Sequence, residues 1–181
     1  MYNRKEMMKI NKKVSKEIVN LINEQIWLEN NASFYYLHLS IEFESNGFGG
    51  MSKFFSTQST EERYHMLKLI DYLLEEDCDP ILPNYNFLED LKEEFDVLTH
   101  FENSLMNEKR VTDSINKIIE ECKKQGDYKT ENFMQWFVTE QREEETKFKT
   151  IIDDLKIIGG NGSGLYEINK ELGKLSITEE N

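Results

Sequence analysis

The sequence predicts an all-α protein: an up-down-down-up bundle of four long helices, with a long crossover between the second and third helices and a short fifth helix at the C-terminal end. Helix breakers are sparse and grouped, because the 181 residues include only 9 glycines and 2 prolines, and these groups separate five segments. The first four segments are rich in Glu, Lys, Leu, Met and Gln and carry apolar residues every three or four positions, which is typical of long helices. We expect a single domain over residues 1–181.

The first two helices are expected at residues 14–45 and 51–77. Only the stretch 45–50 separates them, and it contains Gly47, Gly49 and Gly50. A connection this short predicts that the two helices are antiparallel neighbours.

The third and fourth helices are expected at residues 96–125 and 127–158. Asp96 and Asp127 can cap their N-termini, and Gly159 with Gly160 suits a left-handed stop after the fourth helix. The turn at Gln125 and Gly126 again predicts antiparallel neighbours.

The connection from Asp77 to about Phe95 is much longer and contains both prolines. A helix of ~27 residues is ~40 Å long, and an extended stretch of ~18 residues can span ~60 Å. The crossover can therefore run the length of the bundle. The fifth helix, expected at 165–175 behind a flexible glycine-rich hinge at 160–164, places four apolar residues on one face: Leu165, Ile168, Leu172 and Leu175.

Composition excludes several classes of function. The formal net charge of −13 at pH 7 argues against a nucleic-acid partner, since phosphates need a basic surface. No apolar stretch approaches the ~18 residues of a membrane span, and the polar, basic N-terminus has no apolar secretory core, so we expect a cytoplasmic protein without a membrane partner. Cys78 and Cys122 show no zinc-ligand spacing.

The inward seam of each long helix is apolar at both ends and carries a glutamate in the middle. These four residues are Glu29, Glu62, Glu108 and Glu144. An ionised carboxylate is costly to bury, and no Lys or Arg lies on any seam, so protons or bound cations must compensate the charge. Two divalent ions carry +4, which balances four carboxylates.

Two further residues indicate which metal the centre would hold. His65 follows Glu62 by three positions, so both project from one helix face toward one ion, and Gln141 with Glu144 repeats this spacing on the fourth helix. Mixed carboxylate and imidazole ligands with open positions suit Fe(II), and a carboxylate shared by two irons supports two-electron chemistry. A lone Glu on a seam is usually a surface residue, but coincidence on four seams favours a metal site.

The other two histidines are not predicted to be metal ligands. His38 and His100 have no acidic partner at ligand spacing on the same seam. Each is interpreted as a surface or hydrogen-bonded histidine.

These residues resemble ferritin, specifically the bacterial non-haem type, from about residue 15 to 176. The matching stretches are 23–29 (NEQIWLE), 61–66 (EERYHM), 132–145 (NFMQWFVTEQREEE), 164–166 (GLY) and 170–172 (KEL), together with Tyr36 and Glu108. The resemblance implies two irons per chain. The first is bound by Glu29, Glu62 and His65, and the second by Glu62, Glu108 and Glu144. Gln141 lies near the second iron, and Tyr36 lies beside the centre as an electron donor or hydrogen-bond partner.

The resemblance also implies a third iron site, just inside the shell. Its residues are Glu61, Glu140, Glu143 and Glu144. Haem is not expected, because Arg63 occupies the position of the haem-ligating methionine of bacterioferritins. The implied function is ferroxidase and iron store, using dioxygen or peroxide, in a homo-oligomeric shell of 24 subunits with the fifth helix at the four-fold contacts. Two alternatives remain: a non-catalytic iron-binding shell subunit and a purely structural bundle.

Overall fold

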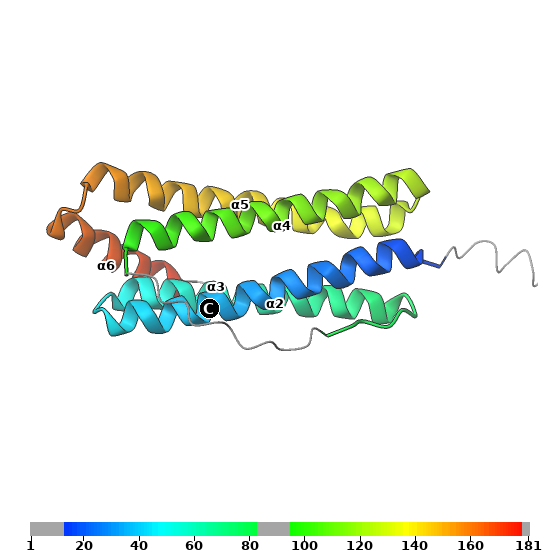
Figure 1. The fold of residues 1–181 in the computed structure, drawn as a ribbon, viewed down its shortest axis with the longest axis horizontal. Coiled ribbons are helices and arrows are strands. Elements are labelled where there is room, and N and C mark those ends of the chain that lie inside the picture. The colour runs from blue at the N-terminus through cyan, green and yellow to red at the C-terminus, as the bar shows by residue number, and fades with distance from the viewer. Residues whose placement is uncertain (1–12, 83–94, 179–181) are drawn as a thin grey trace, which may run out of the picture.

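A computed structural model describes residues 13–82 and 95–178, and within these ranges the chain is helical with short connections. The helices are α2 (Lys16–Ser45), α3 (Gly49–Glu75), α4 (Val97–Gln125), α5 (Tyr128–Ile158) and α6 (Gly162–Thr178) (Figure 1). The predicted all-α class and all five predicted helices are confirmed. Most of the expected crossover, and the basic N-terminal residues 1–12, lie outside the described residues, as does the side chain of Leu175.

The four long helices form two antiparallel pairs. In Figure 1, α2 and α3 form the lower pair and α4 and α5 the upper pair, while α6 lies at the left end beside the start of α3. Helix α4 starts at the end of the bundle opposite to the end where α3 stops, so α3 and α4 run in the same direction. This is the predicted up-down-down-up order. None of the described helices is long and apolar enough to cross a membrane.

Local chemistry sets most of the helix ends. The carboxylates of Asp96 and Asp127 accept hydrogen bonds from the N–H groups of Thr99 and Thr130, at 2.8 and 3.1 Å, as the sequence predicts for N-caps. The left-handed stop after α5 lies at Gly159, with φ of 55°, where a side chain would be strained. These ends therefore follow from short-range signals alone.

The start of α6 differs from the prediction. The helix begins at Gly162, three residues earlier than expected, because Asn161 Oδ1 accepts hydrogen bonds from the N–H groups of Ser163 and Gly164. The second half of the predicted hinge is therefore the first turn of this helix.

A tertiary contact caps the start of α3. Phe48 provides no side-chain cap there, but Asn169 Oδ1 of α6 accepts from the N–H groups of Gly50 and Met51, each at 2.9 Å. A Cβ on Gly50 would lie 1.6 Å from the Asn169 carbonyl oxygen, so only glycine permits this approach. The short helix α6 is thereby fixed against the bundle.

The hydrophobic core has two parts, with polar residues between them. On α2, one cluster includes Ile26 and the other starts at Ala32, while on α5 the clusters are separated between Phe137 and Phe148. The seam glutamate of each long helix lies in the interval between the two clusters on that helix. The second cluster is rich in phenylalanine rings. The fold therefore holds the four carboxylates between two rigid apolar layers.

Candidate metal centre

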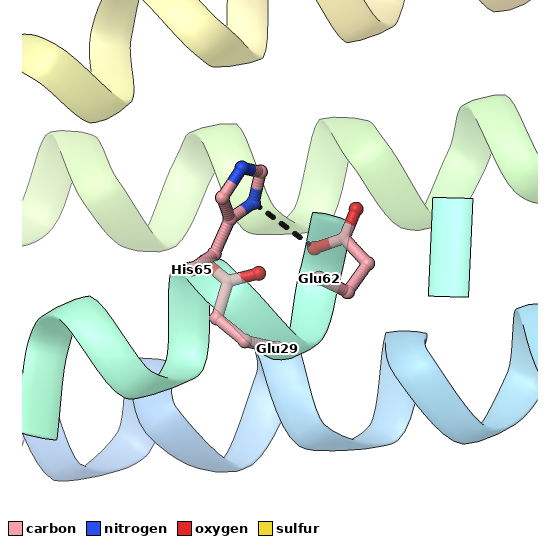
Figure 2. Close-up of side chains that lie close together, drawn as sticks. All are labelled: Glu29, Glu62 and His65. Atoms are coloured by element: carbon pink, nitrogen blue, oxygen red, sulfur yellow. Dashed lines mark ion pairs between the residues drawn. The ribbon is translucent and has the colours of Figure 1, made fainter. Parts of the chain in front are cut away.

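Three ligand-type side chains meet between α2 and α3. Glu29 extends from α2, and Glu62 and His65 extend from adjacent turns of α3 toward the same space (Figure 2). One ligand atom from each lies within 4.8 Å of the other two, and His65 Nδ1 is 3.3 Å from Glu62 Oε2. All three are buried, with exposed fractions of 0–4%. This set offers two carboxylates and one imidazole to a single cation.

Neighbouring residues hold these ligands in place. Gln25 Nε2 donates to Glu29 Oε1 at 2.7 Å. The His65 ring packs edge-on against Trp136, with 5.4 Å between ring centroids, and against Phe137. The packing restricts the rotation of the imidazole, so little conformational entropy remains to be lost when it binds an ion.

The second pair of glutamates comes from α4 and α5. Glu108 and Glu144 are buried, with exposed fractions of 1 and 5%. The Tyr36 hydroxyl of α2 donates to Glu108 Oε1, and Gln141 Nε2 donates to Glu108 Oε2 at 2.6 Å and to the Glu108 carbonyl oxygen at 3.0 Å. Tyr36 therefore links the first pair of helices to the second, and Gln141 fixes the carboxylate of Glu108.

The four carboxylates repel one another and resist ionisation. Burial raises the pKa of Glu29 well above its ordinary value, and the charge of Glu62 raises it further. Burial also raises the pKa of Glu62, as do the nearby charges of Glu108 and Glu144. All four glutamates thus lie within electrostatic reach of one another through Glu62.

Protons can take the place of cations at the second pair. Burial raises the pKa of Glu108 to about 7, even though the hydrogen bonds from Tyr36 and Gln141 favour the ionised form. Burial likewise raises the pKa of Glu144 to about 7, against the opposing effect of the Lys147 charge. Near neutral pH, an arriving cation therefore displaces protons from both groups.

Two carboxylate oxygens without a hydrogen-bond donor are suitable ligands for a metal ion. Glu29 Oε2 and Glu144 Oε2 are buried and have no hydrogen-bond donor among the described residues. Buried carboxylate oxygens are costly without a donor or a cation. Two divalent ions would satisfy these oxygens and neutralise four carboxylates at once.

One cationic side chain near the centre was missed by the sequence reasoning. Lys147 is not on the seam of α5, but its Nζ lies 3.0 Å from Glu144 Oε1 and 3.4 Å from Glu61 Oε2. The expectation that no Lys or Arg compensates the seam charges is therefore wrong for Glu144. The spacing along α5 could have indicated this contact, because Lys147 follows Glu144 by three positions and such residues are neighbours on a helix surface.

Two of the four residues predicted for a third iron share one ion-pair partner. Glu61 and Glu144 share Lys147, whereas Glu143 is exposed and Glu140 is half-buried. Among the described residues, Glu29, Glu62 and His65 form the one group of three or more whose ligand atoms lie within 4.8 Å of one another.

The two remaining histidines share an acidic partner. Glu42 Oε2 lies 3.8 Å from His38 Nε2 and 3.6 Å from His100 Nε2, beside a pocket of about 200 Å³. The expectation that His38 has no acidic partner at ligand spacing is therefore wrong, because Glu42 follows it by four positions on the same helix. The contact of Glu42 with His100 joins α2 to α4, so spacing along one helix does not indicate it.

Comparison with known proteins gives a consistent result. A family model described as a ferritin-like domain matches residues 19–158. The chain is 38% identical over 172 residues to a bacterial non-heme ferritin of Campylobacter jejuni, covering 92% of this chain and 99% of that protein. It is 37% identical to a probable bacterial non-heme ferritin-like protein of Haemophilus influenzae, covering 90% of this chain and 98% of that protein. The solved open pore ferritin of the hyperthermophilic archaeon Archaeoglobus fulgidus matches with a TM-score of 0.84 and 32% identity, over 89% of this chain and 97% of that chain.

Proposed function

Because the chain belongs to the ferritin family, whose members store iron, we propose that it oxidises Fe(II) at its buried carboxylate centre and stores the ferric product inside a shell of identical chains. The observation that carries the proposal is the burial of four glutamates, one from each long helix, within electrostatic reach of Glu62 and with too little positive charge to neutralise them. A purely structural bundle has no use for such a costly arrangement.

The residues divide into two sets of iron ligands. We assign Glu29, Glu62 and His65 to the first Fe(II), and Glu62, Glu108 and Glu144 to the second, with Glu62 between the two. The two ions give up one electron each. Dioxygen takes both electrons with two protons to give hydrogen peroxide, or peroxide takes them with two protons to give two waters.

The protein's own groups hold the ligands and handle protons. Gln25 fixes Glu29, while Gln141 and Tyr36 fix Glu108 by donating to its two oxygens. Because the pKa of Glu108 and of Glu144 is about 7, Fe(II) binding releases protons into the site, where the oxidant consumes them.

The two positions should retain iron unequally. Only the first has an imidazole ligand, whereas the second has carboxylates alone and should release its ion more readily. Site occupancies in iron-soaked crystals would measure this difference, and equal retention at both positions would count against it.

Storage requires a closed shell, for which we propose 24 copies of the chain. Large apolar side chains remain exposed along α2 and α3, which supports burial against further copies. These residues are Trp27, Phe34, Leu37, Ile41, Tyr64, Leu67 and Leu74. A net charge of −13 per chain would make the shell attractive to cations.

Rapid mixing of the apo-protein with Fe(II) in air tests the oxidase activity. We expect fast oxygen consumption at about two irons per chain, and a large loss of the fast phase in Glu62→Ala and His65→Ala. The exposed Glu120→Ala on α4 is the matched control and should retain it. A slow, uncatalysed rate in the unaltered protein with iron still bound would favour the non-catalytic shell subunit, while absence of both binding and oxidation would favour a structural bundle. Sedimentation would report the size of the shell.

A further inference from the structure

Lys147 contacts Glu61 and Glu144, two of the four residues that the sequence predicts as ligands of a third iron. Its Nζ makes hydrogen bonds with Glu144 Oε1 at 3.0 Å and Glu61 Oε2 at 3.4 Å. The Lys147 side chain is 27% exposed, so this ammonium is partly shielded from water. Gln58 Nε2 also donates to Glu61 Oε2, which orients that carboxylate toward the lysine.

We infer that Lys147 is a tethered cation that replaces a third iron and restricts each chain to two. This inference rests on the proposed function, because it concerns the Fe(II) ions bound at the same centre. A third divalent ion would have to displace the ammonium from two carboxylates, or bind beside it and be repelled by its charge. A lysine attached to the chain is always present at high local concentration, so a free ion competes with it poorly.

The same contact gives Glu144 a defined orientation. Lys147 holds Glu144 Oε1, whereas Glu144 Oε2 is buried and has no hydrogen-bond donor among the described residues. Oε2 is therefore the oxygen that Glu144 offers to the second iron. Lys147 acts as a positioning residue: it directs one oxygen of Glu144 to the second iron and keeps the other from a third.

The replacement Lys147→Met removes the charge while keeping an unbranched side chain of similar length. Lys147→Arg keeps the charge, and Lys149→Met removes the charge of an exposed lysine two residues along the same helix. Calorimetric titration of each apo-protein with Zn²⁺, a redox-inert ion, counts the bound ions without depending on oxidation. We expect one additional Zn²⁺ per chain in Lys147→Met alone, at an affinity at least ~10-fold above any third ion in the unaltered protein.

A second replacement locates the additional ion. Adding Glu61→Gln to Lys147→Met should remove the extra Zn²⁺, because it removes one of the two carboxylates that the ion would bind. Circular dichroism of each variant verifies that it is folded. If Lys147→Met perturbs folding, Lys147→Gln serves in its place with the same expected count.

Two results would overturn the inference: a third Zn²⁺ bound equally well by the unaltered protein, or the same count in Lys147→Met as in Lys149→Met. The oxygen-consumption experiment is independent of these counts. If Fe(II) oxidation is absent while the counts behave as expected, the proposed function fails and the role of Lys147 as a tethered cation stands. If oxidation is fast and the counts do not change, only the inference about Lys147 fails.

Discussion

Replacing Glu108 by glutamine should stabilise the metal-free protein, and by more as the pH rises. In the folded protein the pKa of this carboxyl is about 7, against an ordinary value of 4.5. Between these two values the unfolded chain has lost the proton while the folded chain still holds it, which favours unfolding. The contribution of Glu108 to the stability of the apo-protein is therefore greatest below pH 4.5 and falls until the pH passes 7.

The size of this loss follows from the shift in pKa. A difference of 7 − 4.5 corresponds to about 3 kcal/mol at pH 8. The neutral amide of Glu108→Gln does not ionise, and it can still accept from Gln141 and donate to the Tyr36 hydroxyl. We expect the variant to be more stable than the unaltered protein by about 3 kcal/mol at pH 8, and the gain to shrink toward zero at pH 4.5.

Guanidinium unfolding at equal protein concentration, with chelator present, measures this difference from pH 4.5 to 8. The matched control is Glu120→Gln, which alters an exposed glutamate on the same helix and should leave the pH dependence unchanged. With saturating Zn²⁺ at pH 8, the unaltered protein should be more stable than Glu108→Gln, because the variant has lost a metal ligand. A difference between Glu108→Gln and the unaltered protein that stays constant with pH would refute the reasoning.

Phe55→Ala should lower the free energy of unfolding by ~3–5 kcal/mol, because the ring is fully buried among other rings, and a loss below ~1 kcal/mol in denaturant unfolding would contradict this. Gly50→Ala should detach α6, and limited proteolysis would detect this as cleavage within that helix. Gly49→Ala is the control and should remain resistant, because its new Cβ would meet nothing closer than 3.5 Å. Equal resistance of the two variants would disprove the close packing at Gly50. Tyr36→Phe removes a donor to Glu108 and so raises the pKa of that carboxyl; its Fe(II) oxidation should require a higher pH, and an unchanged pH profile would argue against this role.

Most of the fold could be predicted from the sequence, because its signals are local. Grouped glycines, the caps at Asp96 and Asp127, and the 3.6-residue apolar period fixed the helices to within a few residues. The burial of Glu29 and Glu108 was predicted for the same reason, since residues at regular spacing on a helix share one face.

Contacts between helices could not be predicted in this way, because they depend on how far a side chain reaches from its own helix. Nothing near Gly50 in the sequence indicates that Asn169 caps α3 from another helix. Lys147 of α5 reaches the carboxylate of Glu61 on α3, and Glu42 of α2 reaches His100 on α4. The sequence by itself indicated that four acids lie in the middle of a helical bundle, because each of them falls on the apolar face of its helix at a matching depth. Only the tertiary structure decided that the Lys147 ammonium also lies beside Glu61, because these two residues come from different helices and their distance depends on how α3 and α5 pack.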